Sequence, residues 1–216
     1  MGGSGELMLG VLMTDSQKLK NNFEHLRECL ILVRRDYNTY NALYCDANKE
    51  LMTATAPTFF TDIGEILQRD WMLQVVKLMD PAVTEVRGEQ RENLTIRLVV
   101  KQLETEGLLT DEIRNKSKAI LHYGKLIKPA RNRTLAHRDR QCYFKAYFEG
   151  IAMGATTDEQ LYEFIENIQS FADLVGSQIG VDPLDFSSSG CKGDAYDLLR
   201  CLRESQCAQQ GVQPDA

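Results

Sequence analysis

Residues 14–52 read TDSQKLKNNFEHLRECLILVRRDYNTYNALYCDANKELM. Apolar and aromatic side chains recur along this stretch at alternating intervals of four and three residues, which places them on one face of an α-helix. The spacing predicts one long helix over about 14–52 with that face packed against other helices. The positions are Leu19, Phe23, Leu26, Leu30, Val33, Tyr37, Tyr40, Tyr44, Ala47 and Leu51.

Two further helical segments follow directly. The second helix is predicted to begin near Pro57, which suits a first helical turn, and to stop at Pro81. The charged stretch 82–92 reads as a loop that leads to Asn93, an N-cap for a third helix running to about residue 106. Gly107 then closes that helix.

The fourth and fifth helices carry the rest of the expected core. The fourth is capped by Thr110 and has a heptad stripe. Pro129, near its end, favours a kink or a fresh start of the helix. The fifth begins at a capping box, TTDE at 156–159, and continues at helical spacing to Val175. The stripe of the fourth helix consists of Ile113, Ile120, Ile127 and Thr134.

Between these two helices, residues 138–155 are expected to form a loop or short irregular element. Its aromatic side chains suit core packing beneath the loop, with the stacking of unpaired bases as the alternative. They are Tyr143, Phe144, Tyr147 and Phe148.

The chain as a whole is predicted to be an all-α bundle of about five helices. We expect one domain at 14–180 and a mostly disordered tail at 181–216, because the sequence turns rich in Ser, Gly and Gln after Pro183. One short helical candidate, Ala195 to Arg203, lies within that tail.

Composition narrows the class of protein. With 43% hydrophobic and 26% charged residues, the chain is neither wholly disordered nor membrane-embedded. The apolar run Leu7–Met13 is too short for a spanning helix and lacks the basic flank of a signal peptide, so we expect a cytoplasmic location. The six cysteines include no C-x-x-C pair, and no phosphate-binding or dinucleotide-binding glycine pattern occurs. We therefore expect neither a metal nor another cofactor.

Charge is distributed unevenly along the chain. A net charge of −6 argues against a general nucleic-acid coat protein, which relies on many phosphate contacts. Residues 125–140 oppose that sign, with six Lys or Arg against the single acid Asp139. This stretch is either a phosphate-binding patch or a solvated helix face.

The same basic stretch contains the one motif that suggests chemistry, the sequence RNRTLAH at 131–137. Arg131 is a fixed cation, Asn132 is a neutral hydrogen-bonding neighbour, and His137 can exchange protons near pH 7. Such a trio suits RNA cleavage without a metal, because the ribose 2′-hydroxyl is itself the nucleophile. The alternative is a helix-end histidine beside surface arginines.

Helix geometry bears on how this motif would work. Residues six apart on an ideal helix differ by about 240° around the axis and about 9 Å along it, so Arg131 and His137 of one chain cannot meet at one phosphate. A two-fold axis beside them would bring a second pair into the same cleft. Arg133 lies four residues before His137 and shares its face, so it is expected to supplement phosphate binding.

Asp70 is a further candidate outside the basic stretch. It lies close to the apolar stripe of the second helix, where a buried carboxylate would orient a catalytic group. The alternative is a helix-edge ion pair with Arg69 or Lys77.

The motif R-N-x-x-x-A-H on the fourth helix of an all-α domain resembles the HEPN superfamily of helical domains. The segments RDWML at 69–73, LMDP at 78–81 and ENLTI at 92–96 resemble its branch linked to phage abortive infection. The resemblance covers residues of about 20 to 178.

This resemblance implies a metal-independent endoribonuclease of a phage-defence or toxin–antitoxin system, working as a symmetric homodimer whose two motifs face each other. Arg131 and His137 would be catalytic with Asn132 assisting them, and RNA would be the substrate, with an antitoxin protein as a partner. Some members are inactive domains that bind RNA, a nucleotide or a partner, which is the alternative function. Members regulated by a nucleotidyltransferase antitoxin often have a tyrosine where this chain has Asp139, so that form of regulation is not expected.

The remaining basic residues complete the expected site. Substrate phosphates would be bound by Arg133 together with Lys128 and Arg138.

Overall fold

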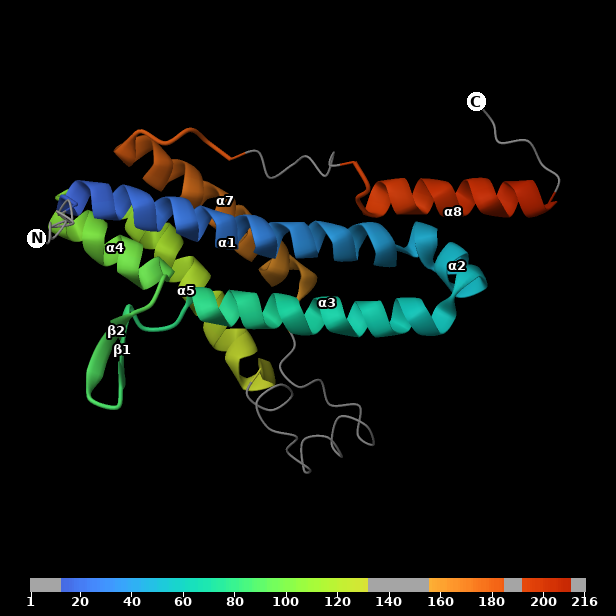
Figure 1. Cartoon of the computed structure of the whole chain (residues 1–216), viewed down its shortest axis with the longest axis horizontal. Helices are drawn as coiled ribbons and strands as arrows, with labels where there is room; N and C mark the ends of the chain where they lie inside the picture. The colour runs from blue at the N-terminus through green and yellow to red at the C-terminus, as the bar shows by residue number, and fades with distance from the viewer. Residues whose placement is uncertain (1–12, 132–155, 185–191, 211–216) are drawn as a thin grey trace, which may run out of the picture.

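The computed structural model describes residues 13–131, 156–184 and 192–210. Within these ranges lie seven helices and one two-stranded hairpin (Figure 1). The all-α class is therefore confirmed. In chain order the elements are α1 (Asp15–Tyr44), α2 (Asp46–Thr55), α3 (Pro57–Leu78), β1 (Val83–Val86), β2 (Glu89–Glu92), α4 (Ile96–Thr105), α5 (Asp111–Arg131), α7 (Asp158–Ile179) and α8 (Ala195–Gln210).

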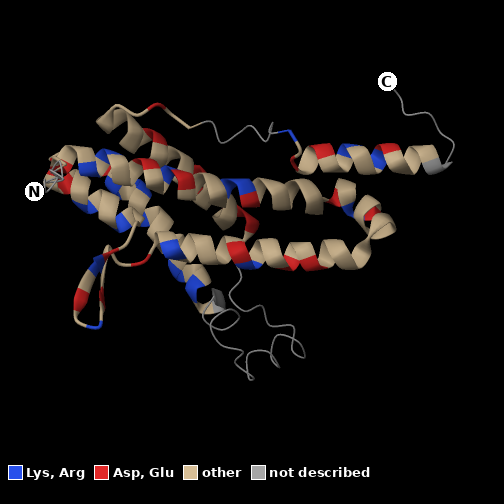
Figure 2. Ribbon diagram, in the orientation of Figure 1, with Lys and Arg blue, Asp and Glu red and all other residues tan. Residues whose placement is uncertain are grey.

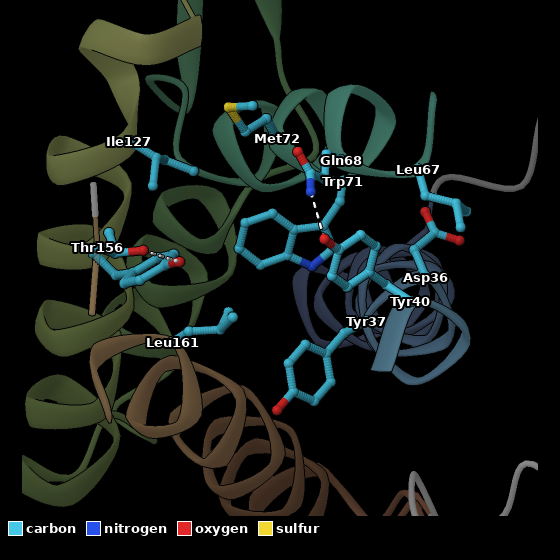
Figure 3. A pocket seen from close by; sticks show the side chains of 11 residues that line it. Asp36, Tyr37, Tyr40, Leu67, Gln68, Trp71, Met72, Ile127, Thr156 and Leu161 are labelled. Atoms are coloured by element: carbon cyan, nitrogen blue, oxygen red, sulfur yellow. Dashed lines mark hydrogen bonds between the residues drawn. The ribbon is translucent and has the colours of Figure 1, made fainter. Parts of the chain in front are cut away.

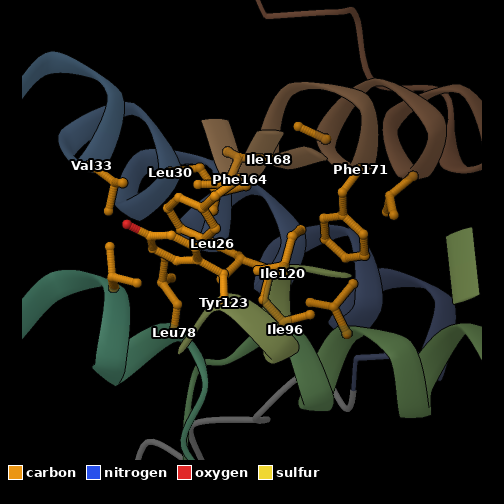
Figure 4. Packing of buried hydrophobic residues seen from close by; sticks show 14 of the residues in the cluster. Leu26, Leu30, Val33, Leu78, Ile96, Ile120, Tyr123, Phe164, Ile168 and Phe171 are labelled. Carbon is orange, nitrogen blue, oxygen red and sulfur yellow. The ribbon is translucent and has the colours of Figure 1, made fainter. Parts of the chain in front are cut away.

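The main core forms where α1, α3, α4, α5 and α7 meet (Figure 4). The predicted apolar face of α1 supplies five of its side chains, from Leu19 to Val33, each at most 1% exposed. Phe164 of α7 stacks on Tyr123 of α5 at 4.2 Å between ring centroids and meets the edge of Trp71 from α3 at 5.9 Å. Three helices are thus joined through one aromatic cluster.

The single helix expected over 14–52 is wrong in one respect, because the chain breaks at Cys45 into α1 and α2. Cys45 adopts an extended conformation, with φ −67° and ψ 153°. The Asn48 side chain donates to the carbonyl oxygen of Ala42 at 2.6 Å, near the end of α1 where carbonyl groups lack helical partners. The break is therefore stabilised by a buried side chain of the next helix.

A second, smaller apolar cluster lies where α1, α2, α3 and α8 meet. Leu199 of α8 is buried there at 2% exposure, and the Arg203 guanidinium donates to Asn48 Oδ1 at 2.6 Å. The helical candidate at 195–203 is confirmed and extends to Gln210. The segment expected to be a mostly disordered tail thus contains a helix that packs on α1 and α2.

The loop expected at 82–92 is a β-hairpin instead. β1 and β2 pair antiparallel, and the two connecting residues, Arg87 and Gly88, both have positive φ, at 55° and 83°. Such a pair forms the turn whose twist matches two antiparallel strands. The sequence concealed this because charged residues occupy both sides of the second strand.

The caps of the remaining helices match the sequence with two exceptions. Thr110 accepts from the Ile113 amide at 3.2 Å, as predicted. Asn93 does not cap α4, because Thr95 does so, while Asn93 Nδ2 donates to the Pro81 carbonyl at 2.8 Å. The box of α7 is formed by Thr157 with Gln160 rather than with an acid. The expected irregular element at 138–155 lies outside the described residues.

The aromatic cluster gives a stability prediction. Phe164→Ala should lower the free energy of unfolding by about 3–5 kcal/mol, because it removes a ring that is 1% exposed and leaves a cavity between Tyr123 and Trp71. Tyr162→Ala, which removes a ring that is 61% exposed on the same helix, is the control and should change it by no more than about 0.5 kcal/mol. Urea denaturation measures both, and equal losses would contradict the assignment of Phe164 to the core.

The break at Cys45 gives a second prediction. Asn48→Ala should cost about 1–3 kcal/mol, since it leaves the Ala42 carbonyl and the Arg203 guanidinium without this partner. The exposed neighbour Lys49 provides the control, Lys49→Ala. Hydrogen exchange of α8 amides should quicken in the first variant only, and unchanged exchange there would show that α8 docks independently of Asn48.

Candidate functional site

Helix α5 ends at Arg131, the first residue of the predicted motif. Three residues of its predicted stripe are buried, Ile113 and Ile120 at 0% and Ile127 at 4% exposure, and Thr134 lies outside the described residues. Its opposite face is exposed at Lys118, His122 and Lys125. Because one face is fixed in the core, the end of the helix at Arg131 has a defined position on the molecule.

The structure describes two of the six predicted site residues, Lys128 and Arg131. Arg131 is the last residue of α5, and Lys128 lies one turn earlier with an exposed side chain. These two positions are neighbours on a helix surface because they are three residues apart. The other expected site residues, namely Asn132, Arg133, His137 and Arg138, lie outside the described residues, as does the Arg131 side chain.

Pro129 does not end the helix. The α-helix continues through it to Arg131, and the residues beyond are not described, so the predicted fresh start or kink stays a prediction for the segment that follows. Proline lacks the N–H that would bond to the carbonyl of Lys125, which leaves that carbonyl free to face another donor.

Near its end, α5 exposes basic side chains, whereas the neighbouring α7 exposes acidic ones. Lys125 and Lys128 are exposed on α5, whereas the first turns of α7, which packs on it, expose Asp158, Glu159 and Glu163 (Figure 2). The positive potential of this region therefore lies on α5 itself. Within the described ranges, no group of three His, Cys, Asp or Glu is arranged to hold a metal ion.

A pocket of about 350 Å³ lies beside this part of α5 (Figure 3). Ile127, one turn before Arg131, forms part of its wall, and so does Thr156, the first described residue after the segment 132–155. The hydroxyls of Tyr123 and Thr156 are 3.2 Å apart and hydrogen-bonded. Described residues on either side of the segment 132–155 thus contribute to the pocket wall. Its remaining lining comes from Asp36, Tyr37, Tyr40, Leu67, Gln68, Trp71, Met72 and Leu161.

Asp36 is the buried carboxylate of this region, at 8% exposure. Burial raises the pKa of its carboxyl group above the ordinary value and the nearby Asp70 adds to that rise, while the Arg35 guanidinium, 3.7 Å away, opposes it. The candidate Asp70 is itself exposed and accepts a hydrogen bond from Gln74 Nε2 at 3.4 Å. Of the two interpretations given for Asp70, the buried carboxylate is therefore wrong.

Sequence reasoning missed Asp36, although a signal was present. Asp36 lies three residues after Val33 in the apolar face of the first helix, so helical spacing places it at the edge of that buried face. The next residue, Tyr37, fits the four-and-three spacing better, so the spacing alone does not single out Asp36.

The raised pKa of Asp36 gives a pH prediction. The folded state binds this proton more tightly than the unfolded state, so the stability of the native protein should fall as pH rises from the ordinary aspartate pKa of about 3.9 through the raised value. Asp36→Asn removes this titration. Its free energy of unfolding, relative to the native protein, should therefore increase over that pH range.

Urea denaturation at a series of pH values measures this difference. Asp62→Asn, which removes an exposed carboxylate of α3, corrects for the loss of one negative charge. A relative stability of Asp36→Asn that decreases with rising pH would contradict the assignment.

Comparison with known proteins adds to this geometry. No curated protein and no solved structure gives a match to the chain. The family model of AbiU2, of HEPN type, matches residues 16–194, a range that runs from the first turn of α1 to the residue before α8 and contains the whole RNRTLAH motif. Because the match covers most of the chain, the protein belongs to the AbiU2 family, an abortive-infection family of HEPN domains.

Proposed function

We propose that this protein is a metal-independent endoribonuclease of a phage-defence or toxin–antitoxin system. The observation that carries the proposal is the R-N-x-x-x-A-H sequence that starts at the end of α5, inside the region matched by an abortive-infection HEPN family. Cytoplasmic RNA is the proposed substrate, and an antitoxin protein is the proposed partner.

The proposed reaction needs only groups that the chain and its substrate supply. His137 accepts the proton of the ribose 2′-hydroxyl, whose oxygen attacks the adjacent phosphorus. Arg131 stabilises the negative charge that develops on the phosphoryl oxygens, and Asn132 holds one of them by a hydrogen bond. The 5′-oxygen leaves and takes up a proton, so the products are a 2′,3′-cyclic phosphate and a 5′-hydroxyl end.

Phosphates on either side of the cleaved bond are proposed to bind along the basic end of α5. Lys128 is exposed one turn before Arg131, and Lys125 is exposed three residues earlier still. Arg133 and Arg138 follow in the sequence. Clustered cations of this kind give binding that weakens with salt and carries little sequence preference.

A two-fold dimer completes the proposed site. Helical geometry separates Arg131 from His137 of one chain by about 240° around the axis and about 9 Å along it, so the pair needs an equivalent pair from a second copy to surround one phosphate. An isologous interface beside the end of α5 would place two motifs in one cleft. This makes dimerisation a requirement for cleavage rather than a separate property.

The test is cleavage of mixed cellular RNA by purified protein in excess chelator. His137→Ala should lower the rate by about 10²–10⁴-fold, the usual worth of a positioned acid–base group. His122→Ala is the matched control, because His122 is exposed on α5 and has no arginine six residues before it. Its rate should equal that of the unaltered protein.

Two outcomes would contradict the proposal. Undiminished cleavage by His137→Ala would remove this histidine from the mechanism. Intact RNA with the unaltered protein, together with RNA binding that survives His137→Ala, would instead favour the function of a non-catalytic binding domain.

A further inference from the structure

The pocket beside α5 has a lining that the proposed cleavage reaction does not use. Four aromatic rings contribute to its wall: Tyr37 and Tyr40 from α1, Trp71 from α3 and Tyr123 from α5. Figure 3 shows Tyr40 and Trp71 side by side between α1 and α3, with the Asp36 side chain beside Tyr40 and the Tyr37 ring on the side toward α7. Three helices of the core therefore hold these rings in fixed positions.

The charge of this lining is negative. Asp36 is the one charged residue among the eleven that line the pocket, all of which lie in the described ranges. Asp70 lies near enough to oppose the ionisation of Asp36 and so adds a second negative charge. The Arg35 side chain that faces Asp36 is 66% exposed and lies outside the lining. The printed lining residues therefore offer a carboxylate to a bound cation and no cationic side chain to a phosphate or other anion.

The aromatic rings also attract cations. The face of an aromatic ring is negative, so cations are held over Tyr and Trp faces, more strongly where water is excluded. Tyr37 already has the Arg34 guanidinium at 5.8 Å from its ring centroid. Trp71 Nε1 is covered and has no hydrogen-bond partner, so the indole meets the pocket through its ring carbons rather than through its N–H group.

From these observations we infer that the pocket formed by Asp36, Tyr37, Tyr40, Trp71 and Tyr123 binds an organic cation of the guanidinium or alkylammonium type. The carboxylate pairs with the charged head, and the rings cover its apolar stem. A volume of about 350 Å³ accommodates a ligand of the size of an arginine side chain or a short polyamine. This inference does not rest on the proposed ribonuclease activity.

The two sources of such a cation are a free small molecule and a side chain of a partner polypeptide. Agmatine represents the first, and N-acetyl-arginine amide represents the second. N-acetyl-citrulline amide is the matched neutral probe, because a urea group replaces the guanidinium with almost the same shape.

The experiment uses the fluorescence of Trp71, the only tryptophan of the chain, whose ring lines this pocket. A saturable change in emission is expected with agmatine, with N-acetyl-arginine amide, or with both. Saturation by agmatine only identifies a free small cation, and saturation by the amide identifies a polypeptide side chain. The citrulline probe should bind at least about tenfold more weakly, because its uncharged urea group forms no ion pair with the carboxylate.

Two variants locate the site. Asp36→Asn should weaken binding by about tenfold or more, whereas Glu163→Gln, on the exposed face of α7, should leave the dissociation constant unchanged. If Asp36→Asn fails to fold, Tyr40→Leu tests the same pocket, since it removes the ring and leaves a smaller apolar side chain at a partly exposed position.

The inference is overturned by any of three results. The first is the absence of a saturable signal with either cation. The second is equal binding of the citrulline and arginine probes. The third is an unchanged dissociation constant in the variants at Asp36 or Tyr40.

Discussion

The contact among Trp71, Tyr123 and Phe164 is the interaction on which the arrangement of this protein depends. The rings come from α3, α5 and α7, and the Tyr123–Phe164 pair is stacked while Trp71 meets both by its edges. Because aromatic rings are stiff and large, they fix the distance and rotation between helices more tightly than aliphatic side chains do. The position of α5 relative to the other helices follows from this cluster.

The same cluster relates the core to the candidate site. Tyr123 belongs to the stacked pair, lines the pocket with its neighbour Trp71, and reaches Thr156 with its hydroxyl group. Two turns further along α5 the motif begins at Arg131. Tyr123 therefore links the buried core to the end of α5, for which the cleavage chemistry is proposed.

The helices themselves followed from sequence, because apolar spacing records which face of a segment is buried. Local caps such as Thr110 and the stop at Pro81 were also visible. The break at Cys45 was not, since it depends on Asn48, whose amide oxygen is held by Arg203, 155 residues away. The burial of α8 could not be foreseen for the same reason: its apolar positions are few, and their partners lie in α1 and α2.

For the candidate site, the sequence predicted which residue types occur and where they lie along the chain. It did not predict which of their side chains are buried. The basic end of α5 was visible as a run of charges, and membership of the AbiU2 family agrees with the resemblance carried by the motif. The carboxylate of Asp36 was not identified, because an acid at the edge of an apolar stripe has the same spacing whether it is buried or exposed. The two acids differ only in the folded structure, where Asp36 on α1 is buried and Asp70 on α3 is exposed.

None of the helices in the described ranges is long and apolar enough to cross a membrane. The proposed ribonuclease activity requires the 2′-hydroxyl of RNA to be the nucleophile. The most direct test is an oligonucleotide that contains a single ribonucleotide within a 2′-deoxy strand, incubated with the protein in chelator and analysed by mass spectrometry. The account predicts one cut, on the 3′ side of that ribonucleotide, leaving a 2′,3′-cyclic phosphate; cutting of the fully deoxy strand, or a 3′-hydroxyl product, would contradict it.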